Sequence, residues 1–296
     1  MKKFMKTCGI LALVMILAGI VMIAVPGIVK GPEVIRNMKQ SIANGLNKLD
    51  SGVRFNVDSD MNFDSDYPVI SGSSSQTFSV ADIKSMEAEV GTCQMNILPS
   101  DDEDFHVSVE NAGSYQGYVS DGTLYLKTFS STGIGVSAGE SEINLDLQVP
   151  SCRIDLYVPA DFYFEEARLL LGAGAISGTA LLKADDLEIK LAAGEINLTS
   201  LEVNALNAEV GAGTLDCKGS ILENADVICG MGEIKLELWG TKTDFNYDLE
   251  VAAGDVTIDR ESFGGIAGKR NISNNNASKD IKVECAMGSV DITFVN

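Results

Sequence analysis

A glycine-centred motif recurs through the second half of the 296-residue chain. The glycines that define it are Gly174, Gly194, Gly213, Gly232, Gly254 and Gly288. In most copies, apolar residues stand five and three positions before the glycine and two and four positions after it, as Ile189, Leu191, Ile196 and Leu198 do around Gly194. A period of two on both sides of a glycine predicts two short strands that meet at a corner.

The residues between the apolar positions are mostly polar, as Glu195 and Asn197 are, so one face of each strand is expected to be buried and the other wet. A repeat of about 20 residues built from short strands predicts an all-β solenoid that resembles a single-stranded β-helix, because each coil can bury its inner face only by stacking on its neighbours. A glycine is expected at the corner if the backbone needs a positive φ there, or if stacked backbones approach too closely for a Cβ.

The stretch LLLGAGAISG, residues 169–178, also resembles a glycine-rich phosphate loop. A nucleotide-binding fingerprint needs one such loop between a strand and a helix. Here six copies lie between strands, and no helical period follows any of them. We therefore expect no nucleotide and no other cofactor.

The first part of the body shows the same pattern with less regularity. MEAEVGTCQMNI, residues 86–97, places Cys93 at the glycine position and predicts an opening coil. Further alternating strands are predicted, as a cap or a continuation, at residues 105–110, 122–129, 143–150 and 154–159. The stretch 261–279 is rich in Gly, Asn and Ser, and is predicted to be a protruding loop.

An apolar run at residues 8–25 follows three lysines and ends at Pro26. Its length is roughly what a helix needs to cross ~30 Å of hydrocarbon. The basic flank favours an orientation with everything after Lys30 outside the cytoplasm. A cleaved signal peptide is the alternative, although it would have a shorter apolar region and a clearer cleavage site. We expect a basic flank and single transmembrane helix in residues 1–30, an amphipathic helix and linker in residues 31–76, and an extracytoplasmic repeat domain in residues 77–296.

The charge is strongly acidic, with 42 Asp and Glu against 22 Lys and Arg. Residues 51–296 hold 40 of the acids and 15 of the bases. Such a body repels nucleic acid and anionic lipid headgroups. The expected partners are the membrane, through residues 8–25, and an envelope component or membrane protein.

The sequence predicts no catalytic, metal or cofactor site. Six cysteines stand at positions 8, 93, 152, 217, 229 and 285. The five beyond the apolar run are an odd number, which argues against a complete disulfide framework, and they are interpreted as small buried hydrophobes. The single histidine, His106, is expected on a strand surface, because no serine or cysteine motif accompanies it. Trp239 is expected to cover an edge of the solenoid.

Three acids, Glu195, Glu233 and Asp255, share one repeat position, so stacking could align them in a column. Clustered carboxylates hydrolyse polysaccharide in some solenoids, and a column of acids could also bridge calcium. A solvated charged face explains the same residues.

The order of these segments resembles a bacterial β-strand-repeat family of unknown function labelled putative adhesin. The resemblance covers about residues 77–296 and includes DIKSMEAEVGTCQMNI, SDGTLYLK and IDLYVPADFYFEEARLLLGAGAISG. It implies a β-solenoid ectodomain on the cell envelope and transfers no catalytic or binding residue. The leading hypothesis is therefore a noncatalytic, membrane-anchored protein acting in adhesion or envelope interaction. The alternatives are a regulatory or sensory ectodomain of an envelope-stress system, and a carbohydrate-active solenoid.

Overall fold

The computed structural model describes residues 63–129, 134–138, 143–147, 152–264, 268–274 and 277–295. The chain divides into two compact units, one made of Ser59–Ser131 and Pro150–Asn296, the other of Met1–Asp58 and Thr132–Val149. In the second unit, β6 (Ile134–Ala138) and β7 (Ile143–Leu147) form an antiparallel hairpin. The predicted transmembrane and amphipathic helices fall outside the described residues. Within the described ranges, no helix is long and apolar enough to cross a membrane.

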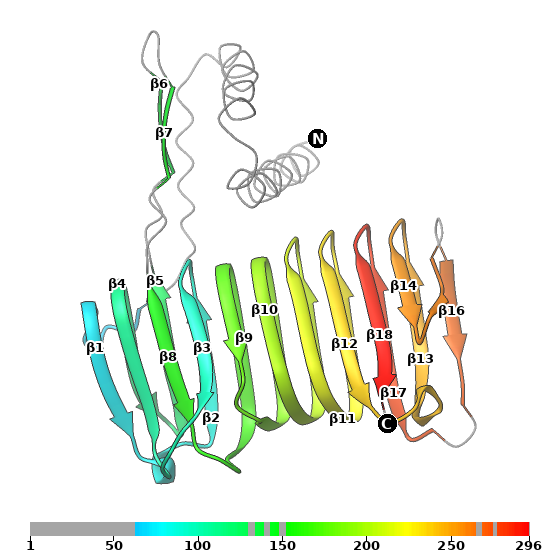
Figure 1. Cartoon of the computed structure of the whole chain (residues 1–296), viewed down its shortest axis with the longest axis horizontal. Helices are drawn as coiled ribbons and strands as arrows, with labels where there is room; N and C mark the ends of the chain where they lie inside the picture. Colours follow the sequence, from blue (N-terminus) through cyan, green and yellow to red (C-terminus); the bar gives the residue numbers. More distant parts are fainter. Residues whose placement is uncertain are drawn as a thin grey trace. The chain divides into compact units, whose positions relative to one another are not determined.

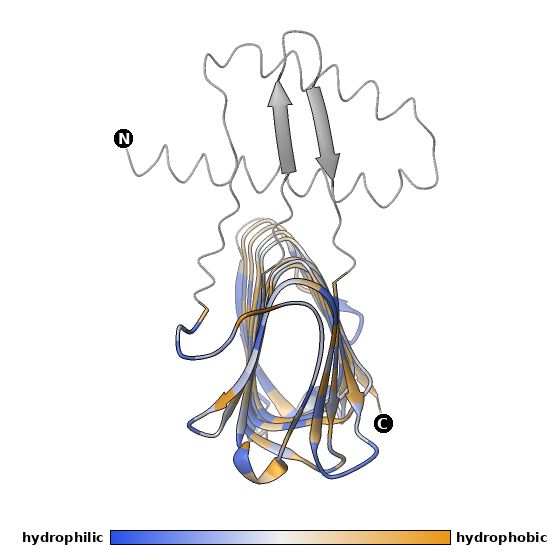
Figure 2. Ribbon diagram, turned by 90° about the vertical axis from the view of Figure 1, so that its left-hand side faces the viewer, coloured by the Kyte–Doolittle hydropathy of each residue, from blue (hydrophilic) through white to orange (hydrophobic). Residues whose placement is uncertain are grey.

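The larger unit is built from parallel coils (Figures 1 and 2). Its central strands are β9 (Tyr163–Gly178), β10 (Leu182–Val210), β11 (Thr214–Cys229) and β12 (Glu233–Trp239). Each coil has an arriving arm, which leads to a corner glycine, and a departing arm, which leaves it. Residues pair in parallel with their equivalents one coil away, so that Glu195 lies between Ala175 and Thr214. The described chain is all-β and solenoid-like.

The core of the larger unit consists of stacked rows of aliphatic side chains. Along the arriving arms, Leu169, Ile189, Ala208 and Val227 are fully buried. Along the departing arms, the same is true of Ile176, Ile196, Leu215 and Ile234. Burying a side chain of this size stabilises a fold by roughly 1.5–3 kcal/mol. The alternation seen in the sequence therefore separates an apolar interior from two polar outer faces.

Antiparallel strands close the N-terminal end of the stack. The first coil consists of β2 (Ser85–Val90) and β3 (Gln94–Pro99), which both pair in parallel with β9. Beyond it, β4 (Phe105–Ser120) runs antiparallel to β5 (Thr123–Phe129), β8 (Arg153–Val158) and β1 (Ile70–Phe78). The predicted domain boundary at residue 77 falls inside β1. The fully buried side chain of Gln116 donates hydrogen bonds to the carbonyls of Asp64 and Tyr67, which ties the segment before β1 to β4.

The C-terminal coils do not stack in the order of the sequence. One coil is made of β13 (Phe245–Val251) and β14 (Asp255–Ile258), and the last one of β17 (Lys279–Cys285) and β18 (Ser289–Val295). Strand β17 pairs with both β11 and β13, and β18 pairs with both β12 and β14. The last coil therefore lies between two coils that precede it in the chain.

The predicted protruding loop at residues 261–279 is wrong for much of that stretch. It contains β15 (Glu261–Ser262) and β16 (Gly268–Ile272), which pair antiparallel with β14 and β13. An open edge strand leaves a row of backbone groups without partners. The polar stretch supplies those partners and closes the C-terminal end of the stack.

The interpretation of the cysteines is wrong for two of them. Cys93 and Cys152 form a disulfide, with their Cα atoms 4.9 Å apart. They directly precede the parallel pair Gln94 and Arg153, so the bond joins neighbouring strands in register. The odd count did not exclude a single pair, and a separation of 59 residues hides this one in the sequence. Cys217, Cys229 and Cys285 are free and buried.

Candidate functional site

The predicted corner glycines form one column in which successive backbones touch. A Cβ built at each of them would lie less than 3 Å from a carbonyl oxygen of the preceding corner. At Gly213, for example, it would lie 2.6 Å from the oxygen of Gly194. The stacking order of the column is Cys93, Gly174, Gly194, Gly213, Gly232, Gly288 and Gly254. Only Gly194 among the six glycines has a positive φ, at 113°. Close approach of the backbones, and not turn conformation, therefore requires glycine at most of these corners.

The outward side of the departing arms, which we call the polar face, carries two parallel rows of side chains. The first row follows the corner directly and consists of Ala175, Glu195, Thr214, Glu233, Ser289 and Asp255. The second row lies two residues further along and consists of Asn96, Ser177, Asn197, Asp216, Lys235, Asp291 and Thr257. Most of these side chains are short hydrogen-bonding groups, and β-pairing fixes their spacing at about 4.8 Å from coil to coil.

The three acids Glu195, Glu233 and Asp255 do lie in one row, but they are not neighbours. Thr214 separates the first two, and Ser289 separates the last two. Acids two coils apart are about 10 Å apart along the stack. Lys235 pairs with Glu233 at 3.0 Å, and the hydroxyl of Ser262 donates to Asp255 at 2.8 Å. Among the described residues, no group of three or more His, Cys, Asp or Glu is placed to hold a metal ion.

The outward side of the arriving arms, which we call the ion-pair face, has a different character. The guanidinium of Arg168 contacts carboxylates of Glu87, Glu166 and Glu188 from three neighbouring segments. Lys190 pairs with Glu188 at 2.6 Å. Burial raises the pKa of Glu87, and the nearby carboxylate of Glu89 raises it further. Much of the charge on this face is therefore satisfied within the protein.

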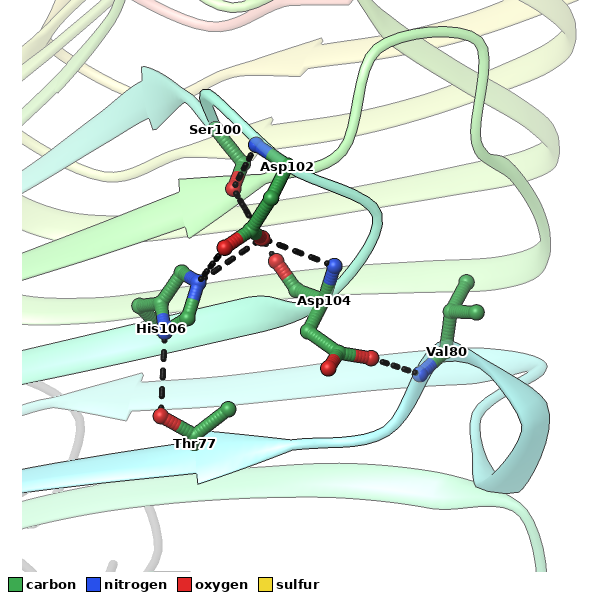
Figure 3. Close-up of polar contacts among 6 residues, drawn as sticks. All are labelled: Thr77, Val80, Ser100, Asp102, Asp104 and His106. Carbon is green, nitrogen blue, oxygen red and sulfur yellow. Dashed lines mark hydrogen bonds and ion pairs between the residues drawn. The ribbon is translucent and has the colours of Figure 1, made fainter.

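His106 lies on the outer surface of β4, in a chain of hydrogen bonds (Figure 3). Its Nε2 atom is 2.8 Å from Oδ1 of Asp102, and its Nδ1 atom is 3.0 Å from the hydroxyl of Thr77. Asp102 also accepts hydrogen bonds from the backbone N–H of Asp104 and the hydroxyl of Ser100. The Asp104 N–H and, after it, the His106 ring lower the pKa of the Asp102 carboxyl.

A carboxylate, an imidazole and a hydroxyl in sequence are also the components of a nucleophilic triad. Here Thr77 and His106 are cross-strand partners in the β1–β4 pair, so their contact follows from strand pairing. The Asp102 carboxylate at the same time organises the turn that leads into β4. The sequence could not identify this cluster, because its members meet only once β1 has paired with β4. The geometry supports a structural tie between β1, the turn and β4.

Trp239 lies at the C-terminal end of β12, where the departing arm ends. Its side chain is 48% exposed, and the ammonium group of Lys218 lies 5.4 Å from the ring centroid. Strand β12 is paired on both sides, so Trp239 does not lie at an end of the coil stack. It lies at the end of a departing arm, on the outward side that forms the polar face, and its ring is available to solvent.

Several solved structures are similar to this chain. Among solved structures, a putative cell adhesion protein from Clostridium sporogenes is 12% identical, and the match covers 75% of this chain and 99% of that chain with a TM-score of 0.42. A putative lipid binding protein from Parabacteroides distasonis is 15% identical, with coverage of 77% and 99% and a TM-score of 0.39. A putative adhesin from Bacteroides fragilis is 13% identical, with coverage of 75% and 97% and a TM-score of 0.30.

No curated protein matches this chain. Residues 83–295, which run from just before β2 to the end of β18, match the family described as Toastrack DUF4097. The match spans the glycine column and both outer faces of the larger unit. The chain therefore belongs to the Toastrack DUF4097 family.

Proposed function

We propose that this protein is a noncatalytic, membrane-anchored adhesion module of the cell envelope, and that its polar face binds an extended surface polymer. The observation that carries the proposal is the pair of continuous rows on the polar face, which present hydrogen-bonding groups at a fixed repeat. A polymer with many hydroxyl groups can meet such rows at several coils at once. Contacts that are individually weak then add up through multivalency.

The charge of the body narrows the class of polymer. Residues 51–296 carry a large excess of acids, and the polar face itself adds Glu195, Asp216 and Asp291. An anionic polymer would be repelled at low salt, whereas a neutral polysaccharide would not. The rigid strands also bind without first having to become ordered, which reduces the entropic cost of association. A neutral polysaccharide is therefore the proposed ligand class.

Two features support the proposed location outside the cytoplasm. The apolar run at residues 8–25 has the length and basic flank of a single-pass anchor. The Cys93–Cys152 disulfide is of a kind that persists in oxidising compartments. We expect the protein to resist extraction by alkaline carbonate. We also expect protease to digest its body in intact spheroplasts. Release by carbonate would count against the anchor.

The polar face can be tested with composition-matched variants of the full chain in detergent. Asn197→Ala, Asp216→Ala and Lys235→Ala together remove an amide, an acid and a base from the polar face. The control, Lys190→Ala with Asn207→Ala and Glu209→Ala, removes the same three kinds of group from the ion-pair face. We expect the first triple variant to lower retention on purified wall polysaccharide about tenfold, and the control to change it less than twofold. Equal effects of the two variants would contradict the use of the polar face.

Crosslinking in native membranes tests the regulatory alternative. Recovery of wall polysaccharide agrees with adhesion. Recovery of kinase-type or transporter-type membrane proteins, without retained polymer, would favour a sensory ectodomain instead.

A further inference from the structure

Two buried cysteines face each other on neighbouring coils near the C-terminal end of the stack. Cys229 ends β11 and Cys285 ends β17, and the two residues are direct partners in the parallel β11–β17 pair. Both side chains point inward and are 1% and 2% exposed. Neighbouring strands are about 4.8 Å apart. This separation lies within the range of Cα distances, roughly 4.4–6.8 Å, that a disulfide can bridge.

The fold already contains one disulfide between adjacent coils. Cys93 and Cys152 directly precede the neighbouring parallel strands β3 and β8, in register, and their Cα atoms are 4.9 Å apart. A bond between adjacent coils is therefore compatible with the stacking geometry of this protein.

The space around the two sulfur atoms is set by the glycine column. A Cβ added at Gly288 would lie 2.5 Å from Sγ of Cys229, and one added at Gly254 would lie 2.5 Å from Sγ of Cys285. In earlier coils the same place is filled by Leu191, below Gly213, and by Val210, below Gly232. Cysteine replaces the aliphatic residue in two coils, those that contain Cys229 and Cys285. These two coils are neighbours in the stack but not in the sequence, because β17 pairs directly with β11.

The two thiols are close enough for each to influence the pKa of the other. The Sγ atom of Cys229 lies 3.2 Å from the carbonyl oxygen of Gly232, and the Sγ atom of Cys285 lies 3.2 Å from the carbonyl oxygen of Gly288. Cys217, the other buried free cysteine, lies on the departing arm of β11, and its parallel partners are Leu198 and Leu236. It has no cysteine beside it and serves as an internal control.

We propose that Cys229 and Cys285 form a second disulfide, which fixes the last coil in its place between earlier coils. In this step the two thiols lose two protons and two electrons, and one S–S bond forms. The electrons pass by thiol–disulfide exchange to a disulfide oxidant such as oxidised glutathione, which is released as two thiols. The bond would hold β17 against β11, a contact that the chain can make only after β13 and β14 have been synthesised.

The bond is expected to form during folding and not afterwards. Burial raises the pKa of Cys229 to about 12 and also raises that of Cys285. Exchange requires a thiolate, so the thiols of the folded, reduced protein react slowly. Oxidant present during refolding should close the bond much faster than oxidant added after refolding.

Peptide mapping of the full chain tests the proposal. The reduced protein is refolded in a glutathione buffer whose oxidant concentration is raised until Cys93 and Cys152 are fully linked. It is then denatured without reductant, alkylated with iodoacetamide and digested for mass spectrometry. We expect a linked Cys229–Cys285 peptide and a fully alkylated Cys217. Alkylation of Cys229 and Cys285 to the extent of Cys217 would overturn the proposal.

Thermal unfolding gives a second readout that does not depend on the mapping. Cys285→Ser removes the proposed bond, and Cys217→Ser is the matched control for loss of a buried thiol. A disulfide that closes a loop of this size is expected to raise the unfolding midpoint by about 10 °C. For each variant we compare the unfolding midpoints of the oxidised and the reduced protein. The difference between these two midpoints should be about 10 °C larger in Cys217→Ser than in Cys285→Ser. Equal differences would refute the second disulfide.

Discussion

At the scale of single residues, the corner glycines are explained by one contact. In each coil, the absent side chain leaves room for the carbonyl oxygen of the corner below it. The sequence left two reasons for glycine open, positive φ and close approach; close approach applies at all six positions, and at five of them it applies without a positive φ. Because none of these five glycines has a positive φ, an alanine there would be strained by the atoms that its Cβ meets and not by its backbone conformation.

This contact predicts a large effect of a single methyl group. Gly213→Ala would place Cβ 2.6 Å from the oxygen of Gly194, and two stacked backbones would have to separate. Overpacking of this kind costs about 3 kcal/mol. Ala212→Gly, at the adjacent position of the same corner, is expected to cost less than about 1 kcal/mol. Urea unfolding of both variants measures the difference, and similar losses would contradict the role of the glycine column.

The turn before β4 provides a prediction about pH. The pKa of the Asp102 carboxyl is lowered from 3.8, first by the backbone N–H of Asp104 and then by His106. In His106→Ala the pKa should rise toward 3.8 and stay below it, because the Asp104 N–H is retained. Carbon NMR of the carboxyl group during a pH titration measures both values.

The sign of the linkage for Asp102 follows from the lowered pKa. The contribution of Asp102 to stability is present above the unfolded pKa of 3.8, and it is lost as the pH falls through the lower folded value. An unchanged pKa in His106→Ala would show that the imidazole does not stabilise the carboxylate.

At the scale of elements, the sequence predicted more about each coil than about the order of the coils. The apolar alternation around Gly194 and Gly213 depends on neighbours within a few residues, and it predicted arms and corners directly. The position of β17 between β11 and β13 depends on contacts between distant segments, which periodicity does not record. The interval between Gly254 and Gly288 is 34 residues, against 19 to 22 for the other copies, and it signalled an irregularity. Strand β16 was not recognised because its sequence, GKRNI, contains one apolar residue and therefore no alternation.

For the acids Glu195, Glu233 and Asp255 of the polar face, the sequence likewise predicted the shared position but not the stacking order. Their shared repeat position predicted one row, and they do occupy one row. Which residues lie between them depends on the stacking order, which places Ser289 and not Asp255 beside Glu233. The His106 cluster depends likewise on the β1–β4 register, which the sequence alone did not give.

The stacking order can be tested by hydrogen exchange. Strands β17 and β18 end the chain, but each is paired on both sides. Their amides should therefore exchange more slowly than those of the edge strand β16, by about tenfold or more. Peptides covering residues 279–285 and 268–272 allow the comparison in one experiment. Faster exchange in β17 than in β16 would indicate that the coils stack in sequence order after all.

At the scale of the larger unit, the repeated register makes the stack behave as a one-dimensional array. Stability in such an array is roughly a sum of the contributions of individual coils and of their interfaces. One complete coil can then be removed if the rows on either side still match. Deletion of residues 195–213 joins Gly194 to Thr214 and keeps a corner glycine, the inward alternation and both outer rows in register.

We expect this shortened protein to fold, with an unfolding midpoint lower by on the order of 5 °C. Deletion of residues 204–213 removes fewer residues but takes away a corner and leaves half a coil unpaired. That variant should lose cooperative unfolding, because its inner face cannot be covered and the strands beyond the deletion lose their register. Circular dichroism during heating, with size-exclusion chromatography, distinguishes the two results. If the full-coil deletion unfolds the protein as completely as the half-coil deletion does, the coils are not independent units, and the glycine column must then act as a single cooperative structure.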